Sequence, residues 1–249
     1  MVNPARIKAY ADSHLRRNKT DKADAQLIAE FCLKQEPPLW SPPPASFRDL
    51  QALVRRLEDL QDNLQQEKNR LQSGVSTPTV VADLQAHITY LEGQMAKLLT
   101  AIHEHIAQYP ALQKQRDLLD SIPGIGALTA AKLLGEIRHI SDFDSARQLA
   151  AYAGLTPRNQ LSGTSVHRKA RLSKTGNAHL RRILYMPAIS AKRWNPIVKA
   201  FCERLEQNGL LPMQAVAAAM RKLRHLAYGV LKTGRPFDPD YLVKEAPLT

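Results

Sequence analysis

The chain has 249 residues, a formal net charge of +12 and a sequence pI near 9.8. That length allows one to two domains, and the basic excess makes nucleic acid the default partner, with an acidic membrane surface as the weaker alternative. No apolar run is long enough to span a membrane, the N-terminus lacks an apolar signal core, and two distant cysteines give neither a disulfide framework nor a metal-ligand cluster, so we expect a soluble, cytoplasmic protein.

Residues 1–36 predict a short basic segment followed by a helix that places Leu27, Ile28 and Phe31 on one face. Asp21 and Asp24 stand three residues apart near the start of that helix, on neighbouring positions. Two carboxylates so placed can hold a hard divalent cation. The alternative, which spacing alone favours, is that acids in a first helical turn complement the helix dipole.

A proline-rich linker at residues 37–45 leads into residues 46–110, where leucines recur at heptad-like spacing on both sides of a turn at residues 73–78. This pattern predicts an antiparallel coiled-coil hairpin. Because an apolar stripe this narrow favours a partner helix, we expect a homo-oligomer that depends on Leu57 and Leu91. The alternative is a helical bundle packed within one monomer.

The next element is the turn Ser121-Ile122-Pro123-Gly124-Ile125-Gly126, followed by an apolar helix pattern over Ala127–Ile137. Two glycines allow a tight turn and close approach of a partner, and the free N–H groups at the start of a helix suit a phosphate. The turn resembles the helix-hairpin-helix element, which binds nucleic-acid backbone without sequence preference. An ordinary glycine-rich helix turn is the alternative.

No acidic residue occurs between Asp144 and Glu203, whereas basic residues are frequent there. A field of one sign over such a length favours a polyanionic partner. The predicted nucleic-acid-binding residues are Gly124, Gly126, Lys132, Arg158, Arg168, Lys169, Arg171, Lys174, Arg181 and Arg182.

Within this window, Ser162-Gly163 lies between Gly154-Leu155-Thr156-Pro157 and Lys174-Thr175-Gly176-Asn177. A serine before a glycine is by itself usually a turn. The whole pattern, from about Leu118 to about Trp194, resembles the C-terminal domain of the insertion-sequence "one-ten" family of bacterial transposases. The resemblance implies that Ser162 is the nucleophile that attacks a DNA phosphate, with Thr164, Ser165 and Ser173 as nearby rivals.

Residues Asn3 to about Phe31 are similar to the end of the RuvC-like domain of the same family, through Lys19-Thr20-Asp21 and Asp24-Ala25. The resemblance implies that Asp21 and Asp24 are the last two of four acids that bind Mg²⁺. The first two acids lie upstream in the family, so we expect this chain to hold only a remnant of that domain. We therefore expect partial exposure of Leu27, Ile28 and Phe31, and no DNA cleavage by the chain alone.

The predicted fold is mostly α, with a short hairpin at most between Thr156 and Thr175. Its parts are a RuvC-like remnant, a linker, a coiled-coil hairpin, a helix-hairpin-helix and serine domain, and a tail, at residues 1–36, 37–45, 46–110, 111–235 and 236–249. The predicted function is that of a DNA transposase or recombinase with DNA and a structured guide RNA as partners, as the resemblance implies. The alternative is a non-catalytic helical module that binds nucleic acid.

Overall fold

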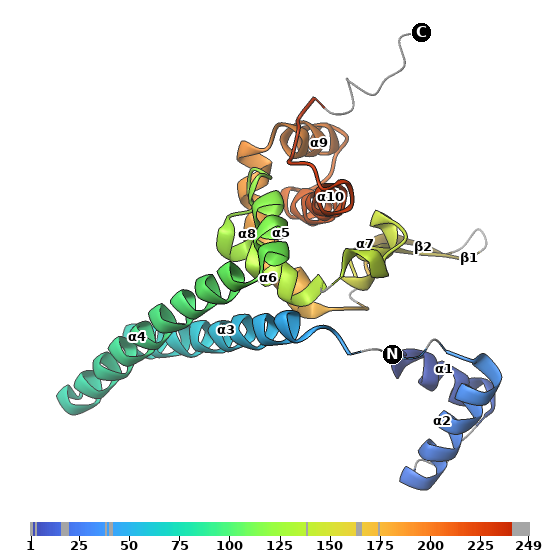
Figure 1. Ribbon diagram of the computed structural model, residues 1–249, viewed down its shortest axis with the longest axis horizontal. Helices are drawn as coiled ribbons and strands as arrows, with labels where there is room; N and C mark the ends of the chain where they lie inside the picture. Colours follow the sequence, from blue (N-terminus) through green and yellow to red (C-terminus); the bar gives the residue numbers. More distant parts are fainter. Residues whose placement is uncertain are drawn as a thin grey trace. The chain divides into compact units, whose positions relative to one another are not determined.

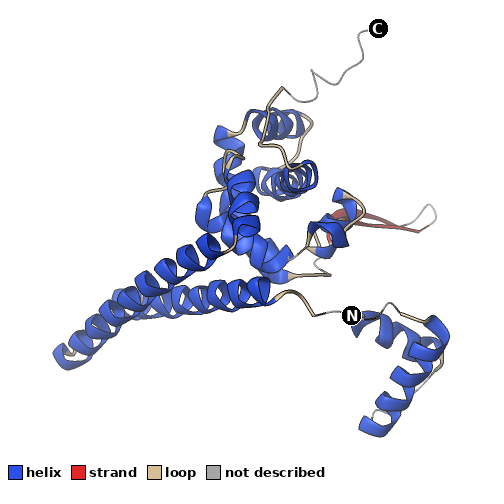
Figure 2. Ribbon diagram, viewed as in Figure 1, coloured by secondary structure: helices blue, strands red, loops and turns tan. Residues whose placement is uncertain are grey.

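The computed structural model describes residues 2, 4–15, 20–37, 39, 42–137, 139–162, 166–173 and 175–240. Over residues 157–162 and 166–171 it describes the backbone. The predicted mostly α fold is confirmed: helices dominate, and the strands of the described residues form one antiparallel pair (Figure 2). The chain divides into two compact units, Met1–Pro43 and Pro44–Thr249, with the division inside the proline-rich stretch.

The first unit contains two helices, α1 (Pro4–Ser13) and α2 (Asp21–Gln35). They pack through an edge-to-face contact between the rings of Tyr10 and Phe31, whose centroids lie 5.4 Å apart. Leu27 and Phe31 are 4% and 3% exposed, so the expectation that both would be uncovered is wrong. Helix α1 supplies the missing cover for Phe31. Ile28, at 48%, is exposed as expected.

The second unit begins with the predicted helical hairpin, α3 (Ala45–Gln72) and α4 (Pro78–Gln108), whose connecting turn lies far from the remaining helices of this unit (Figure 1). The helices that follow are α5 (Pro110–Asp120), α6 (Ala127–Ile137), η1 (Ile140–Asp142), α7 (Ala146–Tyr152), α8 (Ala178–Trp194), α9 (Pro196–Gln207) and α10 (Pro212–Thr233). Strands β1 (Pro157–Ser162) and β2 (Val166–Leu172) stand between α7 and α8. Of the predicted tail, residues 236–240 are non-helical and 241–249 lie outside the described residues.

One hydrophobic core runs from the base of the hairpin through α10. Leu50, Val54 and Leu57 on α3 are at most 1% exposed. A Cβ on Gly135 of α6 would lie 3.0 Å from Val54 Cγ2, which shows how closely α6 approaches α3. The base of the hairpin is therefore part of the second unit's core, and the within-chain packing weighed above holds there.

This packing changes what a mutation of Leu57 or Leu91, the two leucines chosen from the heptad pattern, would test. Leu57 is 0% exposed and Leu91 is 3% exposed, both within the chain. An aspartate at either position would bury an unpaired charge and destabilise the fold itself. These positions therefore cannot report on oligomerisation, and the homo-oligomer stays a prediction. Over the described residues, no helix combines the length and apolarity needed to cross a membrane.

Arg224 on α10 is a charged residue inside this core. It is 1% exposed, and its three guanidinium nitrogens have no hydrogen-bond partner among the described residues. Burial lowers the pKa of Arg224 to about 9, and the nearby Tyr152 opposes that effect only in part. An uncompensated buried cation costs several kcal/mol, so Arg224 lowers the free energy of unfolding.

We predict that Arg224→Met increases the free energy of unfolding by about 1–4 kcal/mol, because an apolar side chain of similar length removes the buried charge. Urea denaturation followed by circular dichroism measures the change. Arg221→Met, at a partly exposed position of the same helix, is the control and should shift the midpoint little. A clear loss of stability in Arg224→Met would show that the guanidinium has a partner in solution.

Candidate functional site

The predicted nucleophile Ser162 is the last residue of β1, at the end of the hairpin where the chain turns back. Its backbone pairs with Val166, while Pro157 pairs with Leu172 at the other end. Six residues of strand at about 3.3 Å each place Ser162 roughly 16 Å from the base. Its rivals Thr164 and Ser165 lie outside the described residues. Ser173 lies at the base, where its N–H donates to the carbonyl of Thr156 over 3.0 Å.

Four of the eight basic residues predicted to bind nucleic acid lie on this hairpin. Arg158 of β1 pairs with Arg171 of β2, and Arg168 pairs with Gln160, with an irregularity in β1 between Arg158 and Gln160. Lys169 lies between these positions in β2. Both strands of the hairpin therefore contain basic residues. Lys174 lies outside the described residues.

The two motifs that flank the hairpin in sequence meet at its base. Gly176 has φ +137°, and a Cβ there would lie 2.4 Å from the carbonyl oxygen of Tyr152. Only glycine fits such an approach in that conformation. The N–H of Asn177 donates to the same carbonyl over 2.7 Å. Arg181, predicted to bind nucleic acid, donates to the carbonyl of Ala153 over 2.9 Å and so braces this base.

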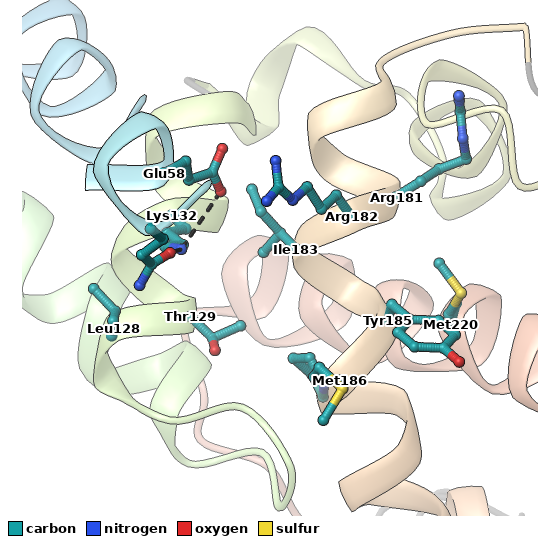
Figure 3. A pocket seen from close by; sticks show the side chains of 12 residues that line it. Glu58, Leu128, Thr129, Lys132, Arg181, Arg182, Ile183, Tyr185, Met186 and Met220 are labelled. Carbon is teal, nitrogen blue, oxygen red and sulfur yellow. Dashed lines mark hydrogen bonds and ion pairs between the residues drawn. The ribbon is translucent and has the colours of Figure 1, made fainter. Parts of the chain in front are cut away.

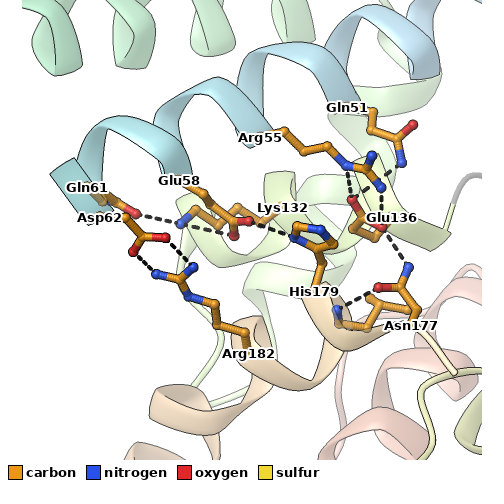
Figure 4. A network of polar contacts seen from close by, with 11 residues as sticks. Gln51, Arg55, Glu58, Gln61, Asp62, Lys132, Glu136, Asn177, His179 and Arg182 are labelled. Carbon is orange, nitrogen blue, oxygen red and sulfur yellow. Dashed lines mark hydrogen bonds and ion pairs between the residues drawn. The ribbon is translucent and has the colours of Figure 1, made fainter. Parts of the chain in front are cut away.

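A buried carboxylate, Glu136 of α6, connects this base to the helical hairpin (Figure 4). It accepts hydrogen bonds from Arg55 Nε at 2.8 Å, Gln51 Nε2 at 3.3 Å and Asn177 Nδ2 at 2.7 Å. Asn177 also caps α8, because its Oδ1 accepts from the N–H of Leu180. Burial by itself raises the pKa of Glu136, but the hydrogen bonds from Arg55 and Asn177 outweigh it, so the pKa lies below its usual range.

Two of the predicted nucleic-acid-binding cations are also engaged within the fold (Figure 4). Lys132 Nζ donates to Gln61 Oε1 over 3.0 Å and lies 3.5 Å from a carboxylate oxygen of Glu58, with its side chain 14% exposed. Arg182 forms a two-point ion pair with Asp62, and its hydrogen bonding holds the pKa of that carboxyl below its usual range. The structure therefore assigns both cations a role in attaching α6 and α8 to α3.

The two glycines of the predicted phosphate-binding turn differ in their surroundings. Gly124 has φ +105°, and a Cβ there would lie 2.7 Å from Cβ of Ala191, so this glycine permits the close packing of α8. A Cβ on Gly126 would have nothing within 4 Å, and Gly126 is exposed. Of the pair, Gly126 is the glycine that a ligand can approach.

The predicted metal ligands belong to the first unit, in the first turn of α2. Thr20 caps this helix by accepting from the N–H of Ala23 over 3.2 Å, so Asp21 and Asp24 also lie where negative charge complements the helix dipole. Among the described residues no three His, Cys, Asp or Glu side chains gather as a metal site. Carboxylates are the donor type of Mg²⁺, which is often held by one or two of them with waters and substrate phosphates completing its shell.

Sequence reasoning did not find Glu136. It is the one acid in α6, Ala127–Ile137, whose other residues are apolar apart from Thr129 and Lys132, and that isolation is the only signal the sequence offers for its role. Its partners lie 81, 85 and 41 residues away along the chain.

Residues 116–203 match the sequence model of the transposase IS116/IS110/IS902 family, and residues 1–77 match a transposase model of the IS110 DEDD type. The chain is also 38% identical over 245 residues to the pilin gene-inverting protein of Moraxella bovis, an alignment that covers 96% of this chain and 74% of that protein. The chain belongs to the IS116/IS110/IS902 family of transposases.

More distant relatives agree with this membership. The chain is 27% identical over 211 residues to the transposase for insertion sequence element IS1111A of Coxiella burnetii, covering 74% of this chain and 57% of that protein. It is 31% identical over 163 residues to an IS110 protein of Streptomyces coelicolor, covering 63% and 40%. The predicted family is thus confirmed. Membership in a transposase family implies DNA as a partner, and DEDD transposases are typically metal-dependent.

We predict that Glu136→Gln lowers the free energy of unfolding at pH 7 by about 1–3 kcal/mol, because the charge-assisted hydrogen bond from Arg55 is lost. A depressed folded pKa means that the unfolded chain binds the proton more tightly. The stabilisation is therefore present above the unfolded pKa, near 4.3, and disappears as pH falls through the folded pKa.

Urea denaturation of the wild type and the variant between pH 7 and pH 3 tests this, with Glu104→Gln at an exposed position of α4 as the control. The gap between wild type and Glu136→Gln should close in acid, and Glu104→Gln should follow the wild type throughout. A gap that stays constant with pH would mean that the charge of Glu136 contributes nothing.

Proposed function

We propose that Ser162 of this chain is the nucleophile of a DNA recombinase and forms a transient covalent bond to DNA, in a reaction that the chain does not perform alone. The observation that carries the proposal is the position of Ser162 at the far end of a hairpin whose base is fixed by the two motifs that flank it in the family pattern. A nucleophile must reach a phosphate of the DNA backbone. A serine at the end of a hairpin suits such an approach.

The reaction requires two exchanges at phosphorus. The Ser162 oxygen loses its proton and forms a bond to a DNA phosphate, while the bond from that phosphorus to one deoxyribose oxygen breaks and that oxygen takes up a proton. A deoxyribose hydroxyl of another strand then attacks the same phosphorus and releases the serine. The phosphodiester bond energy is conserved, so no external energy source is needed. Relatives are named as a gene-inverting protein and as insertion-sequence transposases, and inversion and transposition both require DNA to be cut and rejoined.

Asp21 and Asp24 are the residues we assign to holding Mg²⁺, which when bound supplies positive charge to a phosphate under attack. The cations of the hairpin and the exposed Gly126 turn are assigned to the DNA backbone. By the same resemblance we propose a structured guide RNA as a second partner and the helical hairpin as the route to a homo-oligomer. The alternative, a module that binds nucleic acid without chemistry, predicts binding but no covalent adduct.

We predict that Ser162→Ala, in a complete recombinase carrying this domain, abolishes the covalent DNA–protein adduct and leaves DNA binding nearly unchanged, because the variant lacks only the nucleophilic oxygen. Denaturing electrophoresis with end-labelled DNA measures the adduct. Ser173→Ala, at the base of the hairpin, is the matched control and should keep the adduct. An adduct that persists in Ser162→Ala and disappears in Ser165→Ala would move the assignment.

We predict that replacing Arg168, Lys169 and Arg171 together by alanine reduces the slope of log affinity against log salt for duplex DNA by about two to three units, because each phosphate neutralised contributes about 0.9. Fluorescence anisotropy over a salt series measures the slope. Replacing the exposed Lys97, Lys114 and Lys199 removes the same formal charge elsewhere on the second unit and is the control. Equal slopes in both variants would remove the hairpin cations from the interface.

A further inference from the structure

One face of α8 remains uncovered within the second unit. Its core-facing residues are Leu180, Ile183, Leu184, Pro187, Ala188 and Ala191. The opposite positions recur at helical spacing and carry Arg182, Met186, Ile189 and Arg193, with Tyr185 beside them. Met186 is 66% exposed, Ile189 40% and Tyr185 38%. An exposed apolar stripe interrupted by arginines is unusual for a helix that only faces solvent.

A cavity of about 640 Å³ opens beside this face, between α6 and α8 (Figure 3). Its wall includes side chains of both helices and of α10, namely Leu128, Thr129, Lys132, Tyr185, Met186 and Met220. That volume lies in the range of pockets that hold small planar ligands. Because α6 starts directly after the exposed Gly126, the cavity adjoins the turn that suits a backbone phosphate.

The charge of the cavity wall selects among ligands. Lys132, Arg181 and Arg182 line it, and Glu58 is its one carboxylate among the described residues. The stripe continues along α8 to Arg193, whose guanidinium lies 5.0 Å from the ring of Trp194. Helix α8 itself contains no acidic residue. A ligand that is aromatic or apolar in one part and anionic in another matches this combination, as the bases and phosphates of a polynucleotide do.

We propose that the groove between α6 and α8 binds an unpaired base of a DNA strand. The base stacks on Tyr185 beside Met186, and the adjoining phosphates lie near Arg193. The inference rests on the proposed function, since exchange of strands frees bases from pairing next to the cut and a groove of this kind would hold them apart. In a duplex the base faces are stacked on one another, so only an unpaired base can enter.

The test uses the purified chain and a twelve-nucleotide DNA strand with the fluorescent base 2-aminopurine at its centre. The same sequence is supplied as a duplex and as RNA. Wild type should quench the fluorescence of the single DNA strand. Tyr185→Ala should weaken single-strand binding by about 5- to 150-fold, the equivalent of about 1–3 kcal/mol per stacked base, and should leave duplex affinity unchanged.

Two further variants keep the test decisive. Tyr90→Ala removes an aromatic ring that is 60% exposed on α4 and should change nothing. Met186→Glu alters a residue that is 66% exposed, so the fold should tolerate it, and the added negative charge should repel the strand. Unchanged single-strand binding in both Tyr185→Ala and Met186→Glu overturns the proposal.

Three other results would also decide the matter. Tighter binding of the RNA strand, with the same dependence on Tyr185, would overturn DNA as the occupant. A change of sedimentation in Met186→Glu without any change in strand binding would make this face a contact between copies of the chain. Absence of duplex binding in the wild type would count against the proposed function, while single-strand quenching that depends on Tyr185 would still support the groove.

Discussion

The buried carboxylate of Glu136 is the interaction on which the second unit depends. It is 2% exposed, and it receives donors from α3 and from the residue that caps α8. Without those donors a buried carboxylate would cost several kcal/mol, so the three helices are required to stay together for its charge to be tolerated. The ion pair of Arg182 with Asp62 and the contacts of Lys132 continue this row of polar contacts along α3, and we call the whole row the polar seam.

The polar seam connects elements that are far apart in the sequence. Asn177 joins Glu136 through its side chain and Tyr152 through its N–H, so one residue connects the helical hairpin with the base of the strand hairpin. Gly176 permits the approach because it has no side chain to collide with Tyr152. Polar contacts therefore link α3, through Glu136 and Asn177, to the base of the segment that carries Ser162.

Local patterns in the sequence predicted most of the helices, but few of the contacts in the polar seam. The 3.6-residue period gave α6 its observed bounds, Ala127–Ile137, and the heptads predicted α3 and α4. The family motifs predicted Ser162 as the nucleophile, which stays a prediction; the structure shows only that Ser162 is the last residue of β1. Lys132 and Arg182 were assigned to nucleic acid because their charge was visible, whereas their partners on α3 are distant in sequence. Gly124 likewise carries no local sign that Ala191 lies against it.

The length of the strand hairpin has a mechanical consequence. With Ser162 roughly 16 Å from the base, a tilt of about 10° at Gly176 and Asn177 would carry the serine through nearly 3 Å. Displacements of that size separate a near-attack geometry from an unreactive one. The contacts of Gly176 and Asn177 with Tyr152 at the base therefore determine where Ser162 lies, although they are far from the serine itself.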